Sequence, residues 1–310
     1  MAIKYGWYYR LSEFFRKRFG RRIYKIPVHA AFTCPNRDGT IGSGGCTFCY
    51  NPSFSLAVAQ EGISVREQVE QARAQKKKKY PKARFLVYFQ SYTNTYGEVE
   101  HLRNLYDQAL AAAEDIVGLA IATRPDCVNR EILDILEGYA KRYHLWLEYG
   151  LQSAHNATLD RINRGHDCET FIKAVQETKG RGIFISAHII LGLPGERREQ
   201  MRQTVELLNR LAVDGVKFHH LQVVKNTPLA NDYLRGQVQT LTLDEYIPLI
   251  CDLLEHLSPR IVVHRLVGET LDHDLLLAPH WEKQKSLIIQ DIESELKRRK
   301  SYQGFLYRKL

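Results

Sequence analysis

The segment TCPNRDGTIGSGGCTFCYNP, from Thr33 to Pro52, contains three of the six cysteines in the chain. Cys34, Cys46 and Cys49 have the spacing C-x11-C-x2-C, and the residues between them are too rich in Gly, Asn and Asp for a helix or a strand. Three thiolates on one loop can bind a metal centre. A zinc site is normally completed by a fourth protein ligand, whereas an iron–sulfur cluster held by three cysteines leaves one iron open to another ligand. The spacing alone leaves both kinds of site open.

The composition, 310 residues with 44% apolar and 25% charged, is that of a globular protein. The chain is long enough for one barrel-sized domain or two smaller ones, and one domain with extensions is the simpler interpretation. The chain has no apolar run of about eighteen residues and its N-terminus lacks the apolar core of a signal peptide, so we expect a cytoplasmic protein with no membrane partner. In a reducing cytosol, clustered cysteines more often bind metals than form disulfides. The isolated cysteines are expected to be small buried residues: Cys127, Cys168 and Cys251.

The formal net charge of +9, from 44 basic and 35 acidic residues, favours a polyanionic partner. Residues 1–25 carry eight basic side chains against the single acid Glu13, interleaved with Trp, Tyr and Phe. Basic groups and aromatic faces together are typical of RNA binding. An amphipathic N-terminal helix that packs its aromatic side chains on the domain explains the same pattern, and the two interpretations are compatible. A second basic cluster spans 297–300.

Apolar strand-like runs alternate with amphipathic helical patterns along most of the chain. Strands are expected at 24–32, 84–90, 116–123, 145–151, 183–191 and 216–224. Helices are expected at 64–80, 98–114, 128–142, 155–161, 169–180 and 196–213, the first of them capped by Ser64 and Glu67. Six strands separated by helices predict an α/β fold with a parallel sheet and right-handed crossovers, either open or closed into a partial barrel.

The expected domain organisation has three parts. Residues 1–22 form a basic aromatic extension, residues 23–229 the partial barrel, and residues 230–310 a C-terminal extension that covers the barrel. This last part is expected to contain a helix at 243–257, a short apolar run at 261–266 and a terminal helix at 281–300.

Polar side chains follow every predicted strand. In parallel α/β sheets, ligands bind beyond the carboxyl ends of the strands, so these residues are expected to meet at one rim. The first strand leads into the cysteine loop. The others present Gln90 and Ser91, Thr123 to Asp126, Glu148 with Gln152, His188 with Ile190, and Lys217 with His219.

The cysteine loop followed by six βα units resembles the radical S-adenosylmethionine (SAM) superfamily. The usual spacing there is C-x3-C-x2-C, and this chain has an eight-residue insert after Cys34. The aromatic Phe48 between the last two cysteines fits the pattern. The resemblance implies a partial (β/α)6 barrel with a C-terminal α-rich extension, and a 4Fe-4S cluster held by Cys34, Cys46 and Cys49 whose open iron binds SAM.

Three further motifs resemble the branch that contains oxygen-independent coproporphyrinogen dehydrogenase and the radical SAM subunit of Elongator. They are YGLQS at 149–153, INRGH at 162–166 and HIILGLPGE at 188–196. By this resemblance Gln152, Arg164 and His188 contact the ribose and carboxylate of SAM. Gln90 and Ser91 take the place of the segment that receives its amino group. Ile190, Val223 and Val224 lie on the adenine side, and Phe48 and Glu148 complete the cofactor-binding set.

The whole chain resembles a bacterial subfamily of Elongator-like radical SAM proteins. Some Gram-positive members act in tRNA wobble-uridine modification, on the carboxymethylaminomethyl side chain. The resemblance implies an enzyme that reductively cleaves SAM to a 5′-deoxyadenosyl radical, with tRNA as substrate and an electron donor such as flavodoxin or ferredoxin. Two alternatives are a radical SAM enzyme on a small metabolite and a zinc-stabilised RNA-binding module without catalysis. Candidates for substrate contact or radical quenching are Tyr92, Tyr96, Cys127, Lys217, His219 and His220.

Overall fold

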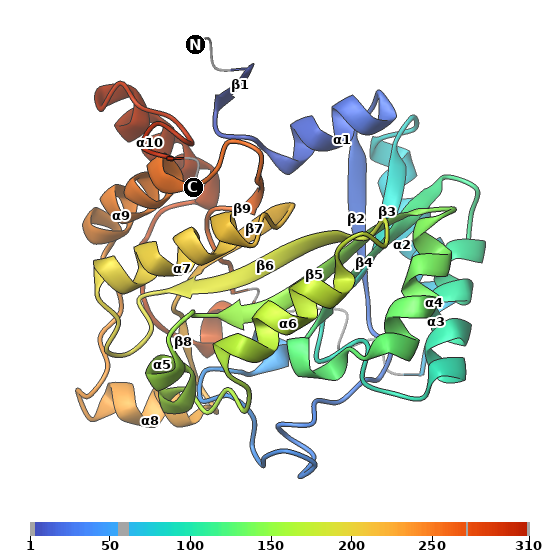
Figure 1. Ribbon diagram of the computed structural model, residues 1–310, viewed down its shortest axis with the longest axis horizontal. Coiled ribbons are helices and arrows are strands. Elements are labelled where there is room, and N and C mark those ends of the chain that lie inside the picture. The colour runs from blue at the N-terminus through green and yellow to red at the C-terminus, as the bar shows by residue number, and fades with distance from the viewer. Residues whose placement is uncertain (1–3, 55–61, 271, 309–310) are drawn as a thin grey trace.

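A seven-stranded parallel sheet curls into a half-barrel with helices on its convex face (Figure 1). The computed structural model describes residues 4–54, 62–270 and 272–308. The strand order is β2-β3-β4-β5-β6-β7-β9. The strands are β2 (Ile23–Val28), β3 (Arg84–Phe89), β4 (Ile116–Thr123), β5 (His144–Gln152), β6 (Phe184–Leu191), β7 (Gly215–His220) and β9 (Val262–Arg265). The predicted partial barrel is confirmed.

The predicted helices form with close to the expected bounds because local capping signals fix their starts. Ser64 and Glu67 form the expected capping box, and a second box joins Thr242 to Glu245. No helix in the described ranges has the length and apolarity needed to cross a membrane. The helices are α2 (Val65–Lys79), α3 (Val99–Ala111), α4 (Arg130–Ala140), α5 (Asn156–Arg161), α6 (Cys168–Thr178), α7 (Arg198–Arg210), α8 (Pro228–Leu234), α9 (Leu243–His256) and α10 (Lys285–Arg298).

The prediction of six strands is wrong, because the C-terminal run at 261–266 supplies a seventh. This run forms β9, which pairs in parallel with β7, and its Val262 and Val263 are buried. The segment expected to cover the barrel therefore contributes to the sheet itself. A short apolar run does not show from sequence alone whether it caps a sheet or extends it.

The strand predicted at 216–224 is divided in two. β7 ends at His220, and β8 (Val223–Val224) turns away to pair antiparallel with β10 (Leu276–Ala278) in a separate two-stranded sheet. The first strand also ends earlier than predicted, at Val28. Both differences lie at the carboxyl ends of strands, where the chain leaves the sheet to build loops.

The N-terminal helix α1 (Leu11–Phe19) closes the amino-terminal end of the half-barrel. The ring of Phe14 lies 5.4 Å from that of Trp146 and 5.4 Å from that of Phe184, and Phe15 is 2% exposed. Figure 1 shows α1 at the opposite end of the sheet from the loop that follows β2. The predicted packing of the N-terminal aromatic side chains on the domain is confirmed.

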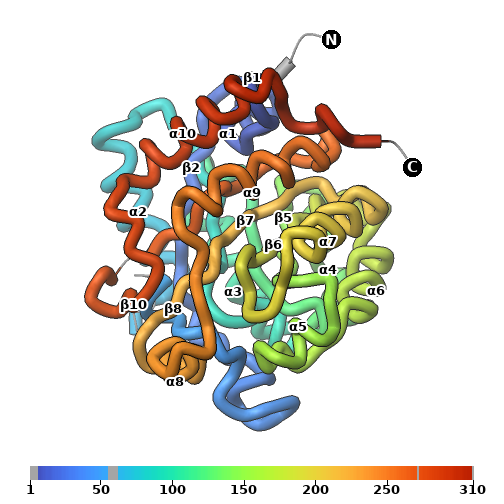
Figure 2. The backbone as a smooth tube through the Cα atoms, turned by 90° about the vertical axis from the view of Figure 1, so that its left-hand side faces the viewer, coloured from blue at the N-terminus to red at the C-terminus, as the bar shows by residue number. Residues whose placement is uncertain are grey.

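The two ends of the chain meet beside α1. The backbone N–H of Gln303 donates to the carbonyl of Trp7 at 2.9 Å, and the Gln303 side chain accepts from the N–H of Tyr9 at 2.8 Å. Figure 2 shows β1 (Lys4–Trp7), α1 and α10 together at this end of the molecule. The basic side chains Arg16, Lys17 and Arg18 of α1 remain exposed there.

Because Phe15 is buried in the half-barrel, Phe15→Ala should lower the free energy of unfolding by about 3 kcal/mol. Arg16→Ala, one residue away but exposed, should change it by less than about 0.5 kcal/mol. Chemical denaturation followed by circular dichroism measures both. A cost below about 1 kcal/mol for Phe15→Ala would contradict the role of α1 as part of the core.

Candidate active site

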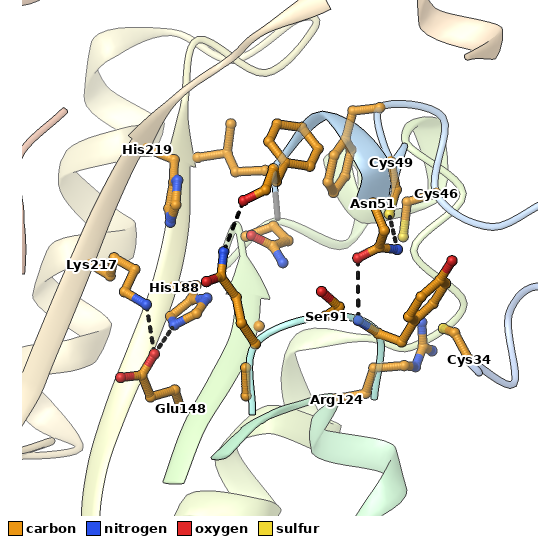
Figure 3. A pocket seen from close by; sticks show the side chains of 18 of the residues that line it. Cys34, Cys46, Cys49, Asn51, Ser91, Arg124, Glu148, His188, Lys217 and His219 are labelled. Atoms are coloured by element: carbon orange, nitrogen blue, oxygen red, sulfur yellow. Dashed lines mark hydrogen bonds and ion pairs between the residues drawn. The ribbon is translucent and has the colours of Figure 1, made fainter. Parts of the chain in front are cut away.

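One cavity of about 340 Å³ lies at the carboxyl ends of the strands, as predicted for a parallel sheet. The cysteine loop forms one side, and side chains from β3 to β9 form the floor and the other side. Figure 3 shows the three cysteines on one side, with Lys217 and His219 across from them. Its lining includes Cys34, Arg37, Cys46, Phe48, Cys49, Tyr88, Gln90, Ser91, Arg124, Glu148, Gln152, Arg164, His188, Ile190, Lys217, His219 and Arg265.

The cysteine loop is fixed to the rest of the rim by Asn36. Its side-chain amide donates to the carbonyl of Asn163 at 2.6 Å, and it lies 3.7 Å from the sulfur of Cys46. A Cβ atom at position 42 would lie 2.5 Å from the Asn36 side-chain oxygen, so only glycine fits there. The long insert after the first cysteine therefore has a defined fold, and all three thiols are free.

Two arginines hold positive charge beside the thiols. Arg164 donates to the sulfur of Cys46 at 3.4 Å and to the carbonyl of Gly150 at 2.6 Å. Arg124 donates to the carbonyl of Arg164 at 2.8 Å and pairs with Asp126 at 2.7 Å. Nearby cations favour the thiolate, which is the form that binds metals.

Burial opposes ionisation of the Cys49 thiol. It raises the pKa of Cys49 to about 12, and the neighbouring Cys46 adds to the shift. A metal centre that binds a thiol in this position replaces the missing solvation and takes the place of the proton. Within the described residues, no group of three or more His, Cys, Asp or Glu side chains is gathered closely enough for a single metal ion.

The donor set fits an iron–sulfur cluster. Three free thiols border a cavity, Arg164 and Arg124 lie next to them, and the Nε atom of Arg164 is buried without a hydrogen-bond partner among the described residues. A buried donor of this kind calls for an acceptor that the protein itself does not provide there. The residues that would hold the cluster are Cys34, Cys46 and Cys49.

An irregularity in strand pairing at the carboxyl end of β5 directs its last side chains into the cavity. The pairing of β5 with β6 shifts register between Gly150 and Gln152, and Gln152 has a φ of 71°. This left-handed conformation is costly for a residue other than glycine, and such strain clusters at functional sites. Just after β3, Gln90 donates to the carbonyl of Phe54 at 3.0 Å, and the hydroxyl of Ser91 is buried without a partner among the described residues.

The floor of the cavity is built around the fully buried carboxylate of Glu148. It accepts from the ammonium groups of Lys25 at 2.5 Å and Lys217 at 2.6 Å, and from His188 at 2.8 Å. Nδ1 of His264 lies 3.5 Å away. Figure 3 shows Lys217 and His188 converging on this carboxylate. We name Glu148, Lys25, Lys217, His188 and His264 the floor network.

Burial and charge compete in the floor network. Burial acts to raise the pKa of Glu148, but the ammonium groups of Lys217 and Lys25 hold it well below its usual range. Burial lowers the pKa of Lys217 to about 7 against the opposing effect of Glu148. Burial likewise lowers the pKa of His188 to about 3, so this imidazole is neutral at neutral pH.

The structure brings together all of the predicted site residues except Val223 and Val224. The cavity lining includes the three cysteines with Phe48, Gln90, Ser91, Glu148, Gln152, Arg164, His188 and Ile190. Val223 is not part of the lining and packs instead in an apolar cluster with Ile190, Leu193 and Leu221. Of the further candidates, Tyr92, Lys217, His219 and His220 line the cavity, whereas Tyr96 and Cys127 do not. The roles assigned to these residues remain predictions.

Sequence reasoning missed Lys25, Asn36, His264 and Arg265. The sequence did offer a signal for Lys25. It is a charged residue between apolar neighbours in the strand β2, which belongs to a buried sheet. His264 and Arg265 were overlooked because their strand was not assigned to the sheet. No pattern in the sequence marks Asn36, whose role depends on a contact with residue 163.

Glu148→Gln should lower the free energy of unfolding by about 3–5 kcal/mol, because it leaves the buried ammonium group of Lys217 and the half-buried one of Lys25 without their counter-ion. Glu206→Gln is the control, since Glu206 pairs with Arg202 on the surface at 2.6 Å and such pairs contribute about 0–1 kcal/mol. Chemical denaturation of both variants provides the comparison. Equal effects would show that the floor network does not stabilise the fold.

Comparisons with known proteins identify the family. The model of the radical SAM superfamily matches residues 37–208, more than half of the chain, and the model of the radical SAM C-terminal domain matches residues 213–298. Cys46 and Cys49 lie within the first match and Cys34 lies just before it. Protein YhcC of Escherichia coli (strain K12) is 42% identical over 267 residues, 86% of this chain and 84% of that protein. YtqA of Bacillus subtilis (strain 168) is 36% identical over 303 residues, 98% of this chain and 94% of YtqA.

Two archaeal proteins are similar over different extents. A tRNA uridine(34) acetyltransferase of Methanocaldococcus infernus is 34% identical over 138 residues, which are 43% of this chain and 25% of that protein. The solved structure of Elp3 from the same organism, lacking residues 1–46, has a TM-score of 0.70 and covers 91% of this chain and 64% of its own. At 18% identity that likeness shows a shared fold. By the match to its model and the near full-length relatives, the chain belongs to the radical SAM superfamily.

Proposed function

We propose that this radical SAM enzyme binds a 4Fe-4S cluster through Cys34, Cys46 and Cys49, cleaves SAM reductively, and modifies the side chain of the wobble uridine in tRNA. The observation that carries the proposal is the cavity at the carboxyl ends of the strands, which has three free thiols on one side and a buried polar floor. The supporting comparison is the match to a tRNA uridine(34) acetyltransferase. The processed group is the carboxymethylaminomethyl side chain of uridine.

The cluster and SAM, when bound, supply the chemistry: one electron cleaves SAM, and the resulting 5′-deoxyadenosyl radical abstracts a hydrogen atom from the substrate. The protein contributes position and exclusion of water. Gln152 and Arg164 would hold the ribose and carboxylate of SAM, and Ile190 would contact its adenine. His188, neutral because burial lowers its pKa, would offer a hydrogen bond to the ribose without adding charge.

Hydrogen bonds within the protein fix the polar side chains of the pocket before any ligand binds. The carbonyl of Gly150 and the sulfur of Cys46 fix Arg164, Glu148 fixes His188, and the carbonyl of Phe54 fixes Gln90. Side chains held in this way lose little conformational freedom on binding. They can therefore align SAM against a second molecule in the same cavity.

Positive charge on two regions of the surface supports a nucleic-acid substrate. Arg37 lines the cavity beside the cysteines, and Lys225 is exposed just after β8. A second group of exposed cations lies on and after α1, at the other end of strands roughly 20 Å long. Because of that separation, the α1 cations would contact tRNA away from the modified nucleotide. The group comprises Arg16, Lys17, Arg18, Arg21 and Arg22.

The electron for SAM cleavage would come from a small one-electron carrier such as flavodoxin or ferredoxin. Cys34 is only half-buried, so the cluster would lie close to the surface of the cysteine loop. Arg37 on the same loop would attract an acidic donor. A radical SAM enzyme on a small metabolite remains the alternative function, and the tRNA experiment below separates it from our proposal.

Replacement of any one of Cys34, Cys46 or Cys49 by Ala should abolish cluster binding and SAM cleavage. After anaerobic reconstitution, these variants should lack the brown iron–sulfur absorbance, bound iron and sulfide, and formation of 5′-deoxyadenosine. Cys168→Ala is the control, because Cys168 is buried at the start of α6 and should leave all three signals intact. A colourless protein that retains zinc and all three cysteines would instead support the zinc-stabilised RNA-binding module.

Cells without this protein should accumulate an unfinished wobble uridine that carries the carboxymethylaminomethyl side chain. Mass spectrometry of tRNA nucleosides measures it, with the wild-type gene and Cys49→Ala as the restoring and non-restoring controls. Purified protein should bind tRNA with an affinity that falls about tenfold or more between 50 and 200 mM salt. An unchanged nucleoside profile would reject the tRNA proposal and favour the small metabolite.

A further inference from the structure

The side of the cavity that faces the cysteine loop carries an excess of positive charge. Lys217 and His219 project from β7, and Arg265 lies beside Lys217 because these two residues are register partners between β7 and β9. All three line the cavity. Figure 3 shows Lys217 and His219 across the cavity from Cys34, Cys46 and Cys49. We name Arg265, Lys217 and His219 the cationic wall.

Arg265 has no counter-ion among the described residues. Its guanidinium makes no ion pair or hydrogen bond with any of them, although the residue is half-buried. The two acids nearby are already engaged. Glu148 is shared by Lys25 and Lys217, and Glu269 pairs with Lys285 at 3.1 Å.

The charges around Arg265 do not balance. Three cations, Lys25, Lys217 and Arg265, lie near this part of the cavity. Of the two acids there, Glu148 alone is not paired with a cation outside this set. Burial is the main cause that lowers the pKa values of Lys217, His219 and Lys285, and the positive charge of Arg265 lowers all three further. Removing a guanidinium from water without a partner is costly, so this geometry favours a ligand that brings negative charge.

We propose that the cationic wall binds an anionic group of the substrate, with the guanidinium of Arg265 as its main contact. The planar fork of donors on arginine matches a carboxylate or a phosphate with two parallel hydrogen bonds. Lys217 supplies a second cation, and the imidazole of His219, held neutral by burial, supplies a further hydrogen-bonding group. This inference rests on the proposed function in that the substrate occupies the same cavity as SAM.

The position of the wall assigns it to the substrate. The carboxylate of SAM belongs on the cysteine side, where Arg164 contacts Cys46. A second anion-binding group across the cavity is therefore free for another molecule. For a wobble uridine, the anion is either the carboxylate at the end of the carboxymethylaminomethyl side chain or a phosphate of the nucleotide backbone.

Two anticodon stem-loops distinguish these sources. One carries carboxymethylaminomethyl-uridine and the other aminomethyl-uridine, which lacks the carboxylate. Binding to the reconstituted, SAM-loaded holoenzyme is measured at equilibrium for the wild type and Arg265→Gln. If the wall binds the carboxylate, Arg265→Gln should weaken the first stem-loop about 10- to 100-fold and the second less than about twofold. If it binds a phosphate, both should weaken alike.

The second measurement needs no RNA. Calorimetric titration of the holoenzyme with acetate and with inorganic phosphate, at constant ionic strength, should show at least one anion that binds the wild type and binds Arg265→Gln at least about tenfold more weakly. Arg260→Gln is the matched control, since Arg260 is exposed just before β9 and should behave as the wild type. Arg265→Lys keeps the charge without the fork and should retain part of the affinity, which covers the case in which Arg265→Gln fails to fold.

The outcomes separate this inference from the proposed function. If neither stem-loop binds the wild type, the tRNA proposal fails, and the acetate and phosphate titrations still decide whether the cationic wall binds anions. If folded Arg265→Gln binds both anions and both stem-loops as the wild type does, the inference is overturned. The inference is also overturned if the wild type binds no anion and no stem-loop with an affinity that depends on Arg265.

Discussion

The interior of this half-barrel depends on one buried carboxylate, that of Glu148 on β5. The edge strands β2 and β9 are not paired with one another, so no ladder of backbone hydrogen bonds closes the sheet. Glu148 accepts from Lys25 on β2 and Lys217 on β7, and thereby joins opposite sides of the curled sheet through its centre. A charge buried so completely is tolerated only because these cations and His188 satisfy it.

The half-barrel is divided along its axis into two environments. The amino-terminal half is filled by the aromatic side chains of Phe14, Trp146 and Phe184, and the carboxyl-terminal half by the floor network and the cavity. The division follows from the parallel sheet, because every strand ends at the same rim and every loop there contributes to the site. The fold alone does not identify the substrate, which has to be argued from the side chains of the cavity.

Much of the fold was predictable from sequence because its signals are local. The capping box at Ser64 and the alternation of strands and helices depend on neighbours within a few residues, and the cysteine loop is marked by its own spacing. What could not be predicted depends on contacts between distant segments. β9 joins the sheet only because β7 offers a free edge, and Asn36 fixes the cysteine loop through a residue more than a hundred positions away. The inward direction of Arg265 follows from the first of these contacts.

The aromatic packing of α1 closes the amino-terminal end of the half-barrel. Since that end is filled by side chains, no molecule reaches the cysteines through it. A small cofactor and a bulky partner that share one entrance have to arrive in a fixed sequence, small before large. If both enter at the rim, the larger molecule would cover the smaller one, and turnover would follow a compulsory order.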